Sequence, residues 1–260
     1  MQSELLQQLK TFSFPLNVYA YVLAMEPEGL RYLHYGWFED RAESIASAQE
    51  RSTRQLLAWL PAPPARLLEV GAGIGTTLAL LRERGYDVLG ITPDESQINF
   101  MRIRHGADFP VRQVRLEDTD TPPGTLDCIV FQESSQYIAL EQVFSRAANL
   151  LRPGGRLILC DEVLLGEPEP GEYLHSLAHL KSAAAERGFS LVEERNLSSQ
   201  AAPTTDFLLT ATARHRDDLL RLFDISAEQI DALDESNRQY RRKYASGKYG
   251  YVALCFDATV

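Results

Sequence analysis

The chain has little of what marks a secreted, membrane-bound or nucleic-acid-binding protein. Its 260 residues include only three cysteines, and its formal net charge is −10 at pH 7. No apolar run approaches the ~20 residues that a membrane-spanning helix needs, and the first residues lack the apolar core of a signal peptide. Excess negative charge disfavours nucleic acid, whose phosphates attract basic surfaces. We therefore expect no membrane and no nucleic-acid partner.

The cysteines have neither the spacing of metal ligands nor an even number for disulfide pairing. Cys128, Cys160 and Cys255 each lie within an apolar run, which is typical of buried, reduced thiols. We therefore expect a cytoplasmic protein without a metal site. A content of 45% hydrophobic and 24% charged residues is sufficient for one large, well-filled core. A monomer and a homodimer are both compatible with this composition.

Strand-like and helix-like patterns alternate from residue 65 onward. Strands are expected at residues 65–70, 86–92, 109–118, 126–134, 154–165, 189–197 and 248–258. Helices are expected at residues 76–85, 94–105 and 139–151, the second with Asp94 and Gln97 at the spacing of a capping box. Strands separated by helices predict a parallel sheet covered on both faces.

The end of the chain departs from this alternation, because a long helical stretch separates the last two expected strands. These two strands are expected to pair antiparallel. We predict four segments: a helical cap (1–60), a core of Rossmann-like type (61–198), a helical lid insertion (199–246) and a final strand of the core (247–260).

A glycine-rich turn follows the first expected strand. The stretch EVGAGIG begins with Glu69 and has glycine at positions 71, 73 and 75. Such a turn at the carboxyl end of a parallel strand lets a ligand approach the backbone closely. A phosphate-binding loop would continue with Gly-Lys-Ser or Gly-Lys-Thr, and a dinucleotide loop has the spacing G-x-G-x-x-G. The spacing here, followed by Thr76 and Thr77, fits neither pattern.

This stretch resembles motif I of the class I S-adenosylmethionine-dependent methyltransferases, E/D-x-G-x-G-x-G. The resemblance extends over roughly residues 30–257 and is strongest to the small-molecule branch that includes cyclopropane fatty acid synthases. It implies a mostly parallel, seven-stranded α/β sheet with an antiparallel last strand, and S-adenosylmethionine as the cofactor. By resemblance, Gly71, Gly73 and Gly75 pass under the cofactor and Glu69 orients the loop.

The tips of the second and third strands carry two further parts of the resemblance. GITPDESQ resembles the G-I/L-T-x-S-x-x-Q segment of that branch, which assigns cofactor contacts to Thr92 and Gln97. Thr92 stands where most of the family has an acid, and Gln97 has the alternative of only capping its helix. LED resembles W-E-D, so that Leu116 would pack near the adenine and Glu117 would accept from its amino group. Solvated loop acids would give the same pattern.

The segment after the fourth strand, FQESSQYI, resembles the S-Q-D-x-x-x-H segment that reaches the transferred methyl group. Gln132 and Glu133 match, whereas Tyr137 stands where the family often has histidine. This replacement removes a common general base, since a phenol with a pKa of ~10 is a poor proton acceptor at neutral pH. Gln132 is assigned to the cofactor, and Glu133 and Tyr137 to catalysis.

An upstream segment, LRYLHYGWF, resembles the H-x-G-x-W/Y segment that closes over the methionine end of the cofactor. It adds Tyr35 as a cofactor-binding and catalytic candidate, together with Gly36 and His34. Farther along the chain, His175 and His179 are candidates for the acceptor pocket.

These features predict an S-adenosylmethionine-dependent methyltransferase that acts on a small metabolite of natural-product type. One alternative keeps the fold and the cofactor: the cofactor's own amine attacks its aminobutyrate chain, which gives azetidine-2-carboxylate and methylthioadenosine. Another is a nicotinamide-dependent oxidoreductase or a non-catalytic nucleotide-binding module, which the glycine spacing disfavours.

Overall fold

The structure, a computed structural model, describes residues 3–168 and 171–259, and the chain divides into two compact units. The sheet unit consists of Thr53–Ser198 together with the described residues of Lys248–Val260. The helical unit consists of the described residues of Met1–Ser52 and Ser199–Gly247. Helix α3 (Ile45–Leu57) contains the division between Ser52 and Thr53.

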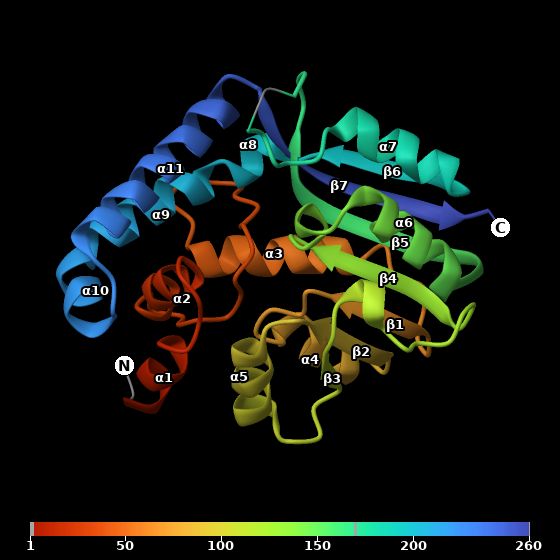
Figure 1. The fold of residues 1–260 in the computed structure, drawn as a ribbon, viewed down its shortest axis with the longest axis horizontal. Helices are drawn as coiled ribbons and strands as arrows, with labels where there is room; N and C mark the ends of the chain where they lie inside the picture. The colour runs from red at the N-terminus through yellow and green to blue at the C-terminus, as the bar shows by residue number, and fades with distance from the viewer. Residues whose placement is uncertain (1–2, 169–170, 260) are drawn as a thin grey trace. The chain divides into compact units, whose positions relative to one another are not determined.

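The sheet unit is built on a seven-stranded sheet in the described part of the chain, in the order β3-β2-β1-β4-β5-β7-β6 (Figure 1). The strands are β1 (Arg66–Val70), β2 (Asp87–Thr92), β3 (Val111–Gln113), β4 (Leu126–Gln132), β5 (Leu151–Leu164), β6 (Phe189–Asn196) and β7 (Tyr249–Ala258). Strands β1 to β5 pair in parallel, and β7 runs antiparallel to both β5 and β6. The expected fold, including its antiparallel last strand, is confirmed.

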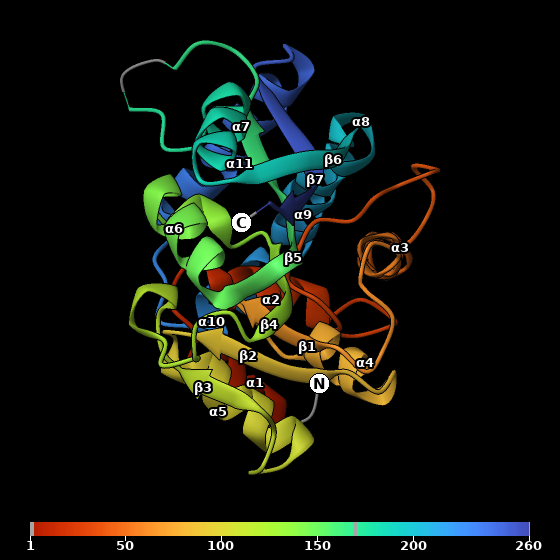
Figure 2. The same cartoon turned by 90° about the vertical axis from the view of Figure 1, so that its right-hand side faces the viewer.

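The central strands are apolar along most of their length because helices cover both faces of the sheet. In β4, six of the seven residues are buried, and nine of the ten are buried in β7. One face packs against α6 (Leu140–Leu150) and α7 (Leu177–Glu186). Figure 2 shows these two helices along one side of the strands and α4 (Thr76–Glu83) on the other. Helix α5 (Glu95–His105) follows β2 and contacts β2 and β3.

The helical unit contains α1 (Ser3–Leu9), α2 (Leu16–Ala24), most of α3, α9 (Pro203–Arg214), α10 (Arg216–Leu222) and α11 (Ala227–Ala245). The short α8 (Ser198–Ala201) begins in the sheet unit. Helix α11 starts with a complete capping box, in which Ser226 and Gln229 satisfy each other's backbone N–H groups. Its buried seam packs on α9, which also contacts α2.

The third strand is shorter than expected from its sequence. We predicted a strand over residues 109–118, but β3 ends at Gln113 and a 3-10 helix, η1, follows at Leu116–Asp118. The reason is that β3 lies at the edge of the sheet and its neighbour β2 ends at Thr92, so there is no ladder partner beyond that point. This brings η1 to the carboxyl end of the sheet.

No helix in residues 3–168 and 171–259 is both long enough and apolar enough to cross a membrane.

Candidate functional site

The strand order reverses between β1 and β4, and this is the point where open α/β sheets bind their ligands. The glycine loop leaves β1 here, with Gly71, Gly73 and Gly75 all at positive φ (76°, 54° and 80°). These are left-handed conformations that side chains disfavour. A Cβ on Gly71 would lie 2.4 Å from the Cβ of Ser134, whose hydroxyl donates to the carbonyl of Val70. The first glycine therefore lets the loop pack directly against the end of β4.

Glu69 is the charged residue at the root of this loop. It lies in β1 between Gly90 of β2 and Val130 of β4, and it is almost fully buried. Its Oε2 atom has no hydrogen-bond partner among the described residues. Burial raises the pKa of this carboxyl to about 8, because the charged form loses its hydration. A buried acceptor without a donor at a ligand-binding turn indicates a ligand that brings one.

Thr92 and Gln97, the two residues predicted at the tip of β2, contact each other. The buried Thr92 hydroxyl donates to Oε1 of Gln97 over 3.0 Å and accepts from the backbone N–H of Asp94 over 3.3 Å. Asp94 caps α5 by accepting from the N–H groups of Ser96 and Gln97. The side chain of Gln97 thus bonds to Thr92 at the strand tip, and the expected capping box is only half formed.

The η1 turn places Leu116 and Glu117 at the same end of the sheet. Leu116 is buried in the core, whereas Glu117 is half-buried. Arg146 of α6 fixes the turn by donating to the carbonyls of Leu116 (3.3 Å) and Thr119 (2.8 Å). Sequence reasoning missed this arginine, since nothing in its local pattern points to a turn thirty residues upstream.

The tip of β4 carries the remaining polar candidates. The side chain of Gln132 is buried between two threonines: it accepts from Thr77 over 3.3 Å and donates to Thr53 over 3.4 Å. The next residue, Glu133, has a φ of +59° and donates its backbone N–H to the carbonyl of Cys160. One of its carboxylate oxygens accepts from the Tyr251 hydroxyl over 2.6 Å.

Tyr137 ends a second 3-10 helix, η2 (Ser135–Tyr137), and its side chain is 77% exposed. Two residues of β5 and its following loop hold this helix. Asp161, which is buried, accepts from both the N–H and the hydroxyl of Ser135 and from the N–H of Gln136. His175 donates from Nε2 to the carbonyls of Ser135 and Ile138. His175 therefore anchors the backbone around Tyr137, and His179 lies exposed on α7.

The pKa of Asp161 also differs from its ordinary value. Burial raises the pKa of its carboxyl to about 6, although the hydrogen bonds from η2 favour the charged form. Sequence reasoning missed Asp161, yet a signal was present: an acidic pair interrupts the apolar strand LILCDEVLL.

Tyr35, with its neighbours His34 and Gly36, belongs to the helical unit, whereas the other predicted site residues belong to the sheet unit. The segment around it is held firmly within its own unit. The N–H of Gly36 donates to Thr204, and a Cβ on Gly36 would lie 2.6 Å from the Cβ of Ala48. His34 is buried and donates from Nδ1 to the carbonyl of Tyr35, and burial lowers its pKa to about 4.

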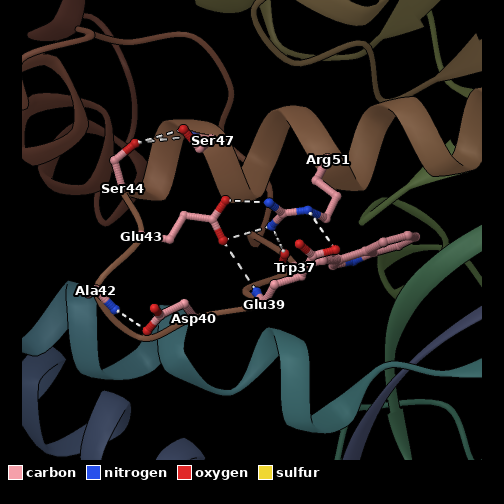
Figure 3. A network of polar contacts seen from close by, with 8 residues as sticks. All are labelled: Trp37, Glu39, Asp40, Ala42, Glu43, Ser44, Ser47 and Arg51. Carbon is pink, nitrogen blue, oxygen red and sulfur yellow. Dashed lines mark hydrogen bonds and ion pairs between the residues drawn. The ribbon is translucent and has the colours of Figure 1, made fainter.

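An arginine on α3 fixes the chain that follows Tyr35 (Figure 3). The Arg51 guanidinium donates to the carbonyl of Trp37 over 2.7 Å and to both carboxylate oxygens of Glu43. It also lies 3.2 Å from the carboxylate of Glu39. The hydrogen bonds from Arg51 are the main reason that the pKa of Glu43 lies below its usual value. These contacts hold the segment from Gly36 to Glu43 in place. The role of Tyr35 in the site stays a prediction.

Comparison with known proteins decides the class of the molecule. Residues 68–159, which include β1, the glycine loop and the tip of β4, match the family model of a methyltransferase domain. The chain contains a methyltransferase domain, and its fold is that of the class I S-adenosylmethionine-dependent methyltransferases. The nicotinamide-dependent and non-catalytic alternatives are therefore not supported.

The methyltransferase has relatives of similar length and fold. It is 27% identical over 248 residues to the methyltransferase GfsG of Streptomyces halstedii, with 85% of each chain covered. It is 32% identical over 145 residues to the 27-O-demethylrifamycin SV methyltransferase of Amycolatopsis mediterranei, with 52% of this chain and 53% of the relative covered. Its fold is similar to that of the cyclopropane synthase MmaA2 of Mycobacterium tuberculosis (TM-score 0.82, 18% identity, 97% and 98% coverage).

The residues present fit the cofactor of this methyltransferase family. Glycines in the left-handed conformation occupy every second position of the loop, so no side chain at these positions blocks a ligand from the backbone. The unpartnered Oε2 of Glu69 is an acceptor suited to the ammonium group of an amino acid moiety. In the described part of the chain, no group of three or more histidine, cysteine, aspartate or glutamate side chains is arranged to hold a metal ion.

Proposed function

We propose that this methyltransferase transfers a methyl group to a hydroxyl oxygen of a small metabolite of natural-product type. The name of the Amycolatopsis relative specifies an O-demethylated acceptor of this kind. The observation that carries the proposal is the carboxylate of Glu133, positioned by a hydrogen bond at the carboxyl end of β4. A hydroxyl acceptor must lose its proton as it is methylated, and a positioned carboxylate can accept it.

The cofactor is held, in this proposal, by Tyr35 and by residues at the ends of four strands. Glu69 accepts from the ammonium group, and the loop backbone around Gly73 contacts the methionine and ribose parts. Glu117 accepts from the adenine amino group beside Leu116. The complete proposed set is Tyr35, Glu69, Gly71, Gly73, Gly75, Thr92, Gln97, Leu116, Glu117 and Gln132.

The chemistry divides simply between the cofactor and the chain. S-adenosylmethionine supplies an activated methyl group, so the protein has to align the acceptor and exclude water. In the proposed step, the acceptor oxygen forms a bond to the methyl carbon, the carbon–sulfur bond breaks with its electron pair on sulfur, and Glu133 takes the hydroxyl proton. Tyr137 contributes its ring or hydroxyl beside Glu133. Asp161 and His175 hold the backbone of η2, the element that carries Tyr137.

Product analysis tests this proposal. Purified protein is incubated with S-adenosylmethionine carrying a ¹³C-labelled methyl group, together with 27-O-demethylrifamycin SV or a panel of hydroxylated polyketides. We expect a labelled methyl ether and an equal amount of S-adenosylhomocysteine, both seen by mass spectrometry. Methylthioadenosine and azetidine-2-carboxylate from the cofactor alone would instead establish the intramolecular reaction and reject the transfer.

The role of Glu133 has its own test within the same assay. Removal of a general base typically lowers the rate 10²- to 10⁴-fold, so Glu133→Gln should lose roughly a hundredfold or more in kcat. The control is Glu141→Gln, which neutralises an exposed carboxylate on α6 that pairs with Arg187. Wild-type turnover by Glu133→Gln would remove this residue from the mechanism.

A further inference from the structure

Glu133 has an unusual backbone conformation. It is the one non-glycine residue at positive φ in the described part of the chain, with a φ of +59°. Side chains reach this left-handed region at an energetic cost, and such strain persists only where surrounding contacts enforce it. The contacts of Glu133 include the bond from its N–H to the carbonyl of Cys160 (2.8 Å) and the bond from Tyr251 to its carboxylate (2.6 Å).

Tyr251 is held rigidly on β7. Its side chain is fully buried, its N–H donates to the hydroxyl of Ser198, and its carbonyl accepts from the N–H of Leu197. The preceding Gly250 permits this approach, since a Cβ there would lie 2.6 Å from Leu165 and 2.8 Å from the Ser198 hydroxyl. The phenol therefore has a fixed position relative to the sheet.

Tyr251 accepts a hydrogen bond from Cys160 and donates one to Glu133. Burial, reinforced by the neighbouring Cys160 and Glu133, raises the pKa of Tyr251 well above its ordinary value, so its hydroxyl stays protonated and donates to the carboxylate. Burial also raises the pKa of Cys160, so this residue stays a thiol and donates to the Tyr251 oxygen over 3.4 Å. The chain of donors thus ends on Glu133, from β5 through β7 to the tip of β4.

We infer that Tyr251 is a positioning residue for methyl transfer, which holds the Glu133 carboxylate in one orientation and stabilises it as the anion that accepts the acceptor's proton. This inference rests on the proposed role of Glu133. Without the phenol, the carboxylate would lose the hydrogen bond from Tyr251, its orientation would be less restricted, and its charged form would be less favoured.

Other ionisable groups lie near this carboxylate and remain in the test as a constant background. Tyr137 on η2 interacts electrostatically with Glu133, and so does Cys160 of β5. Asp161 and Glu162 follow Cys160 on β5 and also act on Tyr137.

The chain offers a matched control two residues away on the same strand. Tyr249 is also buried, lies on the same face of β7, and donates its hydroxyl to the carboxylate of Glu172. Glu172 also pairs with Lys248 over 2.8 Å. Tyr249→Phe therefore removes a comparable tyrosine–carboxylate bond from the same strand while leaving the bond to Glu133 intact.

The direct experiment is a ¹³C NMR titration of the glutamate carboxyl carbons, with the Glu133 signal assigned by its loss in Glu133→Gln. In Tyr251→Phe we expect the apparent pKa of Glu133 to rise by about one to two units, since a hydrogen bond to a charged group is lost. In Tyr249→Phe it should stay at the wild-type value. Incorporation of 3-fluorotyrosine at position 251 keeps the hydroxyl and strengthens it as a donor, so that the Glu133 pKa should fall.

These outcomes separate the inference from the proposed function. An equal Glu133 pKa in wild type, Tyr251→Phe and the fluorotyrosine protein would overturn the positioning role, whatever the reaction is. In the methyl-transfer assay, Tyr251→Phe should lower kcat and move the acidic limb of its pH profile upward, with KM little changed. If Glu133→Gln is inactive but Tyr251→Phe keeps the wild-type profile, the inference fails while the proposed function stands. If Glu133→Gln retains full activity, the proposed base itself fails.

Discussion

Glu69 is a single buried group that couples the stability of the fold to pH. Its pKa rises from 4.5 to about 8 on folding because of burial. Between these values the folded chain holds a proton that the unfolded chain has released, so the free energy of unfolding falls as the pH rises from about 4.5 to about 8. The full difference corresponds to at most about 5 kcal/mol.

The variant Glu69→Gln isolates this effect. Glutamine does not titrate, so the variant should gain stability relative to wild type as the pH is raised from 5 to 8. Urea unfolding at several pH values measures the difference in the free energy of unfolding between the two proteins. The titration of all other groups contributes equally to both and cancels in this difference. A wild-type-minus-variant difference that is constant over this range would show that Glu69 is charged throughout.

Glu117 is the proposed reader of the adenine amino group. In Glu117→Ala one hydrogen bond to a desolvated partner is lost, so we expect S-adenosylhomocysteine to bind roughly ten- to hundredfold more weakly by calorimetry. The adjacent Asp118→Ala is the control, because Asp118 lies exposed on the same turn. If Glu117→Ala changes the affinity for S-adenosylhomocysteine by less than about twofold, Glu117 is a solvated loop residue that does not bind the adenine.

The individual site residues differ in how far the sequence could predict them. The glycines and Glu69 lie within one short motif, and local spacing was enough to bring them together. Tyr251 gave no such signal, because its partner Glu133 is 118 positions away and the contact depends on the antiparallel register of β7 with β5. Arg146 was missed for the same reason, since it bonds to backbone carbonyls that any sequence would provide. His175 was named as a candidate for the acceptor pocket, but its bonds to the backbone around Tyr137 were not predicted.

At the level of elements, alternating patterns predicted the strands and most of the helices, but not their edges. The expected third strand ran to residue 118, although β3 ends at Gln113. The apolar pattern continues through Leu116 because this side chain packs in the core from a 3-10 turn. Burial, not strand geometry, produced the signal there.

Gly36, in the segment before α3, is closely packed against that helix. Gly36 has no space for a side chain, because a Cβ would meet both the Cβ of Ala48 at 2.6 Å and its backbone carbonyl carbon at 3.2 Å. Gly36→Ala should therefore lower the free energy of unfolding by about 1–3 kcal/mol, as overpacked sites do. Gly166→Ala is the control, because a Cβ there meets nothing within 4 Å. Equal denaturation midpoints for the two variants would show that α3 shifts freely to make room.

At the scale of the whole molecule, the predicted lid is the remaining question about function. Residues 199–246 supply α9, α10 and α11 of the helical unit. If these helices close over the bound cofactor, their local opening should become less frequent when a ligand is present.

Hydrogen exchange with and without S-adenosylhomocysteine measures this directly. We expect amide exchange in residues 199–246 to slow on addition of the ligand, beyond any change in the edge strand β6 of the same sample. The Glu117→Ala protein at the same ligand concentration is the control, since its lower occupancy should give a proportionally smaller protection. Protection confined to the glycine loop and the strand tips, with equal exchange in α9 to α11, would show that these helices are a fixed part of the fold and do not act as a lid.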